Sequence, residues 1–184
     1  MRRVARSDVL DWVTYDERRE EIRASAMAAK DRRRVELGDH LVFLFENFET
    51  VLYQIQEMMR AERIVREADV QHEIDTYNEL LGGPGEIGCT LLISIEEAES
   101  RAARLRAWLT LPEHLFVRLP DGRQVRARFD ARQRGEDRLS SVQYLKFATS
   151  GEVPVAVGAD HKALRGEATL TEDQRAALAE DLAG

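Results

Sequence analysis

Apolar residues fall into a few short runs that predict strands. The runs "HLVFLFEN" and "CTLLISI" are apolar at nearly every position, which predicts buried strands at residues 40–46 and 89–95. Two alternating runs around "PDG" in "HLFVRLPDGRQVRARF" predict a hairpin. Shorter strands are expected in "SSVQYLKF" at residues 140–147, in "VPVAV" and in "LRGEATL". Strands are therefore expected near the start, in the middle and near the end of the chain.

A long charged segment with a thin apolar face predicts the first helix. Thr14 and Glu17 have the spacing of a capping box, and the helix is expected to run from there toward Arg34. Acidic residues are concentrated in its first turns and basic residues in its last, which matches the helix macrodipole. Gly38 is expected to end the segment. The exposed side of such a helix offers a surface for a dimer contact.

Capping residues predict where the later helices begin. Asn47 or Thr50 is expected to cap the helix that follows the first strand, and Asp69 the helix in "VQHEIDTYNELL". The segment "EAESRAARLRAWL" places alanine and leucine residues along one side of another helix. Thr171 and Gln174 form a second capping box, which predicts a short last helix.

The order of these elements predicts one α+β domain over residues 1–184. Helices lie mostly between strands, and the hairpin favours a mixed, mostly antiparallel sheet flanked by helices over a doubly wound parallel one. Residues 1–38 are expected to form an N-terminal helical segment that packs on this domain. The chain has no internal repeat and no low-complexity linker that would divide it into two domains.

Composition excludes several classes of protein. The net charge of -7 argues against broad binding to nucleic acid or to anionic membranes, which requires clustered positive charge. No apolar run approaches the roughly 20 residues of a membrane span, and the start lacks a secretory signal, so we expect a cytoplasmic protein. Cys89 is the single cysteine, which excludes a disulfide framework or an iron–sulfur cluster held by this chain alone. We expect it to be an inert buried thiol.

A glutamate interrupts the apolar stripe of "YQIQEMMRAERI", residues 53–64. At about 100° per residue, one side of this helix carries Val51, Ile55, Met58 and Met59. Glu62 falls near the middle of that side, whereas Glu57 and Arg60 fall opposite. A buried carboxylate needs a cation, a metal or several hydrogen-bond donors. In the ordinary interpretation, the helix frays or bends before Glu62, or an arginine covers the carboxylate. In the functional interpretation, Glu62 lies in a polar pocket as a metal ligand or proton acceptor.

Other acidic residues and a histidine extend the hypothesis of a metal site. Glu46 ends the first strand, and together with a glutamate of the next helix it could bind iron, manganese or zinc; the ordinary alternative is a carboxylate leaving the core into a loop. Asp160 and His161 are adjacent, so their side chains would converge only in a loop. The chain has no HxH, HxxxH or ExxH spacing, so a metal site would assemble from distant segments. The candidate metal ligands are Glu46, Glu57, Glu62, Asp160 and His161.

Two further charged segments have both a functional and an ordinary interpretation. The basic run "KDRRRVELG" could hold a phosphate or an acidic partner, or could simply be a cationic helix end. In "GEDRLSSVQY", Glu136, Asp137 and Arg138 precede a strand with Gln143 and Tyr144, which predicts either a polar network or a turn with local ion pairs. No GxSxG, P-loop, GxGxxG or CxxC motif is present, which argues against common hydrolase and nucleotide-binding functions.

Several segments together resemble a bacterial family of uncharacterised proteins, the domain of unknown function 3501. They are "RRRVELGDH", "FEN", "QIQEMMRAERI", "DTYN", "EDRLSSVQYLKF" and "VGADH", and the likeness extends from about Val9 to the last helix. A proline often follows the Asp-His pair in the family, where this chain has Lys162. The family's polar positions map onto Glu46, Gln54, Gln56, Glu57, Arg60, Glu62, Asp137, Arg138, Gln143, Tyr144, Asp160 and His161.

The resemblance implies a redox setting and leaves two functions open. Family members look like companions of rubrerythrin-like proteins and of iron–sulfur oxidoreductases with a heterodisulfide-reductase-type domain. The first hypothesis is therefore an accessory or interaction protein that serves such a partner and has no cofactor of its own. The alternative is a metal-binding protein or metalloenzyme that holds a divalent metal (iron, manganese or zinc) in a carboxylate-rich pocket.

Overall fold

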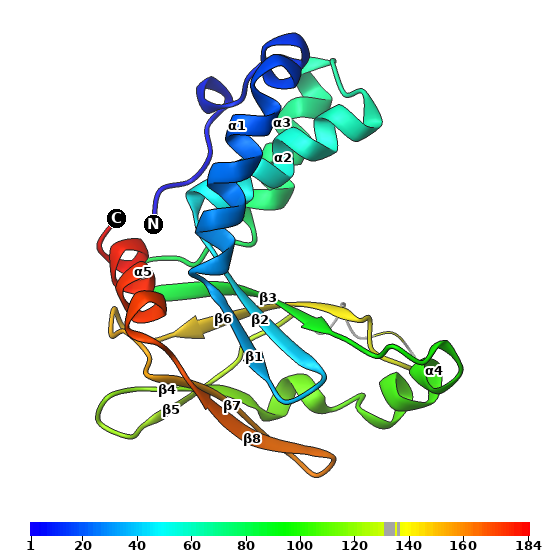
Figure 1. Cartoon of the computed structure of the whole chain (residues 1–184), viewed down its shortest axis with the longest axis vertical. Coiled ribbons are helices and arrows are strands. Elements are labelled where there is room, and N and C mark those ends of the chain that lie inside the picture. The colour runs from blue at the N-terminus through cyan, green and yellow to red at the C-terminus, as the bar shows by residue number, and fades with distance from the viewer. Residues whose placement is uncertain (131–134, 136) are drawn as a thin grey trace.

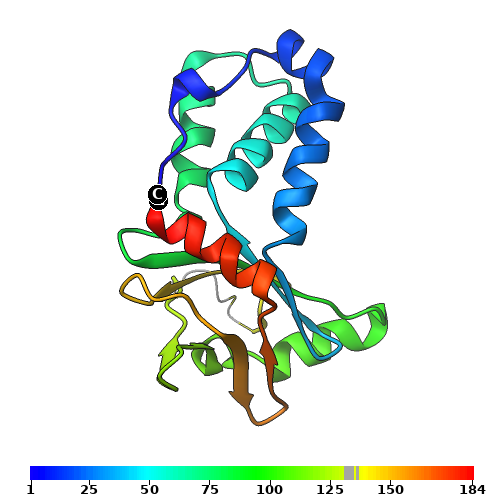
Figure 2. The same ribbon diagram turned by 60° about the vertical axis from the view of Figure 1, so that its left-hand side comes forward.

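A helical arm stands on a body of two β-sheets (Figure 1). The structure, a computed structural model, describes residues 1–130, 135 and 137–184. The arm contains η1 (Arg6–Asp8), α1 (Trp12–Asp31), α2 (Phe48–Glu62) and α3 (Glu67–Asn78). The body contains β1 (Arg34–Leu37), β2 (Leu41–Glu46), β3 (Glu86–Ile93), α4 (Ala98–Ala107), η2 (Leu111–His114), β4 (Leu115–Arg118), β5 (Gln124–Arg126), β6 (Val142–Ala148), β7 (Ala156–His161) and β8 (Leu164–Thr169). The last helix, α5 (Glu172–Ala183), runs along the junction between arm and body (Figure 2).

The predicted α+β fold is confirmed, but the structure has two sheets where the sequence predicted one. Within the described part of the chain, the first sheet has the order β1-β2-β3-β6 and the second β5-β4-β7-β8, and every strand pair is antiparallel. The inner faces of the two sheets share one apolar core, in which Phe43 and Leu91 of the first sheet are buried together with Val157 of the second. The hairpin predicted around "PDG" is formed by β4 and β5.

The first helix begins and ends earlier than predicted. Asp11 caps α1, because its carboxylate accepts hydrogen bonds from the backbone N–H groups of Val13 and Thr14, so the predicted capping box at Thr14 is wrong. The helix stops at Asp31, and Arg34 begins β1. Strand β1 alternates exposed and buried residues, with Val35 turned into the core. Residues 1–38 therefore contribute a strand to the first sheet as well as a helix to the arm.

Of the other three cap predictions, two are right and one is wrong. Asn47 caps α2 and exchanges reciprocal hydrogen bonds with Thr50, and Thr171 and Gln174 form the predicted capping box of α5. Asp69 lies inside α3, which begins at Glu67, so its predicted capping role is wrong. An acidic residue in the first turn of a helix stabilises the macrodipole without capping, and the sequence does not separate these two roles.

The arm has its own apolar core, which the N-terminal segment completes. Val4 and Val9 of this segment are buried against α2 and α3. Two side-chain amides hold the segment in place. Asn78 pairs with both backbone groups of Val4 at 2.9 Å, and Gln56 accepts a hydrogen bond from the backbone N–H of Leu10 at 2.6 Å. Among the residues that the structure describes, no helix could cross a membrane.

Candidate functional site

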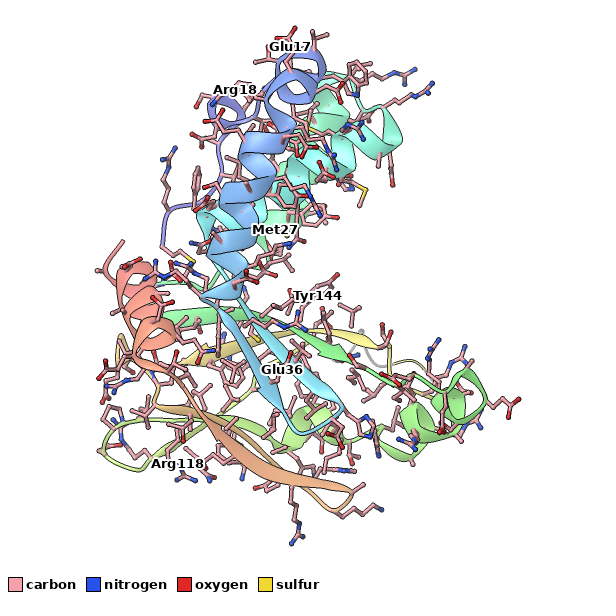
Figure 3. The ribbon with its side chains drawn as sticks, viewed as in Figure 1. Glu17, Arg18, Met27, Glu36, Arg118 and Tyr144 are labelled. Carbon is pink, nitrogen blue, oxygen red and sulfur yellow. The ribbon has the colours of Figure 1, made fainter. Side chains whose placement is uncertain are left out.

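A cleft with a volume of about 790 Å³ lies between the arm and the first sheet. Its lining consists of Met58, Glu62, Glu73, Thr76, Tyr77, Glu79, Leu80, Arg128, Phe129, Asp130, Tyr144, Leu145 and Lys146. Figure 3 shows Tyr144 on the sheet side of the space below the arm. Concave sites with apolar and aromatic walls and a few polar groups are the usual binding sites of proteins. This cleft is therefore the candidate functional site.

Strand alternation places the sheet wall of the cleft. Along β6, Gln143, Leu145 and Phe147 are buried, whereas Tyr144 and Lys146 between them are turned toward the outer face. Tyr144 pairs with Thr90 of β3 and keeps 44% of its surface exposed, which makes it one of the large apolar side chains left open to solvent. A half-exposed tyrosine on a concave sheet face is a typical contact residue for a partner.

Of the two interpretations of Glu62, the one that makes it a buried carboxylate is wrong. Glu62 is the last residue of α2 and is exposed at the rim of the cleft. Arg63 adopts a left-handed conformation with φ 55°, and the N–H of Ile64 bonds to the carbonyl oxygen of Met59 to close the helix end. The helix therefore ends at Glu62, and this side chain does not continue the apolar stripe into the core. This agrees with the ordinary interpretation, in which the helix does not continue regularly past this point.

Glu46 is the buried carboxylate of this region, at 2% exposed. It accepts hydrogen bonds from Thr50 Oγ1 at 2.5 Å, Thr90 Oγ1 at 2.6 Å and Gln54 Nε2 at 3.4 Å. The end of β2 and helix α2 therefore meet at Glu46, as the hypothesis of a metal site requires. The α2 residues that contact Glu46 are the neutral Thr50 and Gln54, however, and not a second glutamate. These donors satisfy the carboxylate and fasten α2 to the middle of the first sheet.

Glu57 and Arg60 lie on the opposite face of α2, where they contact α1. Glu57 accepts a hydrogen bond from the Tyr15 hydroxyl at 2.6 Å and two from Arg19 at 2.8 Å, and Arg60 pairs with Asp16 at 2.7 Å. The hydrogen bonds from Arg19, against the opposing effect of burial, lower the pKa of Glu57 to about 2. Glu57 therefore holds two helices together and does not contact Glu46 or Glu62.

We expect Glu57→Gln to change how stability depends on pH. The folded pKa lies below the unfolded value, so the ion pair stabilises the fold fully above about pH 4.5, and this contribution is lost as the pH falls toward 2. At neutral pH the variant should lose about 1–3 kcal/mol of unfolding free energy, since the pair is only partly shielded from solvent. Urea unfolding of both proteins between pH 7 and pH 2 measures this difference. Glu99→Gln on the exposed side of α4 is the control; equal pH slopes for wild type and Glu57→Gln would contradict the assignment.

Among the described residues, the polar side chains around β6 point to both faces of the first sheet. Gln143 is fully buried and donates to the carbonyl oxygen of Ser140 at 2.9 Å, whereas its neighbour Tyr144 faces the cleft. Asp137 and Arg138 are exposed, and Asp137 pairs with Arg106 of α4 at 3.1 Å. This ion pair joins two distant segments of the chain, so it is not one of the local ion pairs predicted for this turn. Glu136, the third charged residue of this turn, lies outside the described residues.

Asp160 and His161 lie within β7, and their side chains point to opposite faces of the second sheet. Asp160 pairs with Arg126 and with His114 Nδ1 at 2.9 Å, and the hydrogen bond from Arg126 is the main reason why its pKa is lowered to about 2. His161 is 1% exposed, and burial lowers its pKa. Its Nδ1 accepts the N–H of Ala163 at 3.2 Å, so the neutral ring carries its proton on Nε2 and offers no free nitrogen lone pair to a metal.

The five proposed metal ligands do not converge. Glu46 ends β2, Glu57 lies on the face of α2 that contacts α1, Glu62 lies at the cleft rim, and the Asp160–His161 pair belongs to the second sheet. Within residues 1–130, 135 and 137–184, no group of three or more His, Cys, Asp or Glu side chains is arranged to hold a metal ion. Cys89 is buried as expected, and burial raises the pKa of its thiol.

The sequence indicated one residue on each wall of the cleft and missed several others. Tyr144 and Glu62 were candidates, but Glu73, Tyr77 and Phe129 were not. Tyr77 of α3 packs at the edge of the arm core. No pattern along the chain indicates that this edge faces β6, because the two segments are almost 70 residues apart and meet only after folding.

Comparisons with known proteins identify the family and one similar structure. The family model for proteins of unknown function DUF3501 matches residues 3–182. A crystal structure of a novel protein of unknown function from Burkholderia pseudomallei K96243 has 30% sequence identity and a TM-score of 0.90, over 98% of this chain and 100% of that chain. No curated protein matches the chain. The chain therefore belongs to the DUF3501 family of proteins of unknown function.

Proposed function

We propose that this chain is an accessory protein that binds a partner protein in the cleft between the arm and the first sheet. The observation that carries the proposal is the exposed Tyr144 on the concave face, opposite Met58 and Tyr77 of the arm. Tyrosine, methionine and other aromatic side chains are enriched in protein interfaces, and exposed apolar groups in a concave surface indicate a contact site.

The distribution of polar partners supports a binding role. Glu46, Gln56 and Glu57 are engaged with neighbouring segments and hold α2, the N-terminal segment and α1 in place. Two of the polar residues that face the cleft are different, because Glu62 and Glu73 have no hydrogen bond or ion pair among the described residues. The buried polar residues thus build the scaffold, and these two carboxylates are left available for a partner.

The partner that we propose belongs to a redox system. The family resemblance implies companions that are rubrerythrin-like or that carry iron–sulfur clusters, and a chain with one buried cysteine would serve such a system as a binding protein. Its net charge of -7 favours partners with a basic surface over acidic ones.

A matched pair of aromatic substitutions tests the proposal. Tyr144 in the cleft is 44% exposed and Trp12 at the start of α1 is 42% exposed, so both can be replaced by alanine without opening the core. Tagged wild type, Tyr144→Ala and Trp12→Ala are used to capture proteins from a bacterial lysate without oxygen, and the captured proteins are identified by mass spectrometry and iron content.

We expect wild type and Trp12→Ala to retain an iron–sulfur or rubrerythrin-like protein and Tyr144→Ala to retain at least about tenfold less, because a central interface tyrosine typically contributes about 2 kcal/mol. Equal capture by all three proteins would place the binding surface elsewhere. Recovery of no redox protein by wild type would refute the proposed partner class.

A further inference from the structure

We propose that the cleft recognises a cationic side chain, a guanidinium or an ammonium group, presented by a basic segment of the partner protein. This inference rests on the proposed function, since it names the chemistry of the partner at the same site. It follows from three features of the cleft: carboxylates without partners, aromatic rings beside them, and an excess of acidic over basic lining residues.

The arm wall carries two carboxylates that have no ion pair. Glu62 ends α2 and is exposed, whereas Glu73 in the middle of α3 is half-buried. Among residues 1–130, 135 and 137–184, neither makes a hydrogen bond or an ion pair, although this chain forms many arginine–carboxylate pairs elsewhere. A half-buried carboxylate without a partner loses hydration without compensation, and a bound cation would supply that compensation.

Aromatic rings lie next to these carboxylates. Tyr77 belongs to the same helix as Glu73, one turn further along, and its pKa is raised by burial and then by the charges of Glu73, Tyr144 and Glu62. All four groups line the same cleft. A ring face beside a carboxylate favours a cation, because the negative face of the ring and the carboxylate attract the same charge. A planar guanidinium can stack on the ring and bond to the carboxylate at once.

The charge of the lining favours a basic ligand. Among the described lining residues, four are acidic, namely Glu62, Glu73, Glu79 and Asp130, and two are basic, namely Arg128 and Lys146. Arg128 pairs with Glu86, which lies outside the lining, at 2.9 Å. Lys146 on β6 is then the positive group that a ligand meets among the described lining residues, and it lies on the sheet wall. The cation should therefore be held against the arm wall, and Lys146 should weaken its binding.

The size of the cleft limits what enters it. A volume of about 790 Å³ is in the range of small-molecule pockets, which accommodates a few side chains and excludes a folded domain. We therefore expect the partner to insert a loop or a tail with one or two basic residues. The aliphatic part of such a side chain can pack on Met58 and Leu80 while its charge reaches the carboxylates.

Binding of synthetic peptides tests the inference. Fluorescence anisotropy is measured with two labelled, blocked hexapeptides, one of alternating arginine and leucine and one of alternating glutamate and leucine. The proteins are wild type, the double variant Glu62→Lys/Glu73→Lys, the single variant Lys146→Glu, and Glu99→Lys as an exposed control on α4. Circular dichroism establishes that each variant is folded.

We expect the basic peptide to bind wild type and Glu99→Lys equally, about tenfold or more weakly to the double variant, and several-fold more tightly to Lys146→Glu. Added salt should weaken this binding. The inference is overturned if wild type does not bind the basic peptide, if the acidic peptide binds as well, or if the charge variants change nothing. If Tyr144→Ala still abolishes partner capture in that case, the docking function stands and only the cationic chemistry is refuted.

Discussion

Arg33→Ala is expected to lower the free energy of unfolding by about 3–5 kcal/mol, the largest effect that we expect of a single ion pair in this chain. Arg33 is 4% exposed and its partner Asp181 is also buried. The guanidinium donates to the two carboxylate oxygens at 2.7 and 2.8 Å and to the carbonyl oxygen of Ala29 at 3.0 Å. Asn47 donates to the same carboxylate at 3.3 Å. Alanine at position 33 would leave Asp181 as an unpaired buried charge.

The neighbouring Arg32 provides a matched control. It pairs with Asp173 and Glu180 of the same helix α5, but these groups are exposed, so Arg32→Ala should cost less than about 1 kcal/mol. Urea unfolding at neutral pH measures both values. The double variant Arg33→Met/Asp181→Leu should recover much of the loss, because it removes both charges together. Equal losses for Arg32→Ala and Arg33→Ala would show that the buried pair does not anchor α5.

Gly88→Ala is expected to destabilise the protein by about 3 kcal/mol or more and to distort the cleft. A Cβ atom at position 88 would lie 1.8 Å from the carbonyl oxygen of Leu80 and 3.1 Å from the backbone nitrogen of Gly82. Both are backbone atoms of the segment that leaves α3 and rests directly on β3. Because this close contact sets the position of the arm on the sheet, a shift there moves the two walls of the cleft relative to each other.

Gly166→Ala is the control for this substitution. A Cβ atom at Gly166 would meet only the Cδ1 atom of Leu37, at 3.4 Å, so its effect should remain within about 0.5 kcal/mol. Urea unfolding measures the stability of both variants, and capture of the partner reports the state of the cleft. Wild-type stability in Gly88→Ala would contradict the close packing of the α3 exit on β3.

Local patterns predicted much of the fold because each carries its own physical cause. The apolar run of β2, the "PDG" hairpin and the capping residues Asn47 and Thr171 all fix structure within a few neighbouring residues. Strand β1 was missed because four residues after a charged helix give too short an alternation. No local pattern in the sequence indicates that the strands divide into two sheets. An alternating strand shows which of its faces is buried, but it does not show which sheet packs against that face.

The candidate site was harder to predict than the fold, and the error at Glu62 shows why. A helical period extrapolates an apolar stripe correctly only as far as the helix runs, and α2 ends at that residue with Arg63 in a left-handed conformation. The buried carboxylate is Glu46, which was proposed on its position at a strand end alone. Its neighbour Thr90 and the cleft residue Tyr77 come from distant segments that only tertiary structure brings together.

The most direct test of the docking cleft is site-specific photocrosslinking with the captured partner. A benzophenone amino acid replaces Met58, which lines the cleft, or Val65, which is 77% exposed and is not among the lining residues. The account predicts an efficient crosslink from position 58 and little or none from position 65. Crosslinking from position 65 with none from position 58 would contradict it, because the partner would then bind outside the space between the arm and the first sheet.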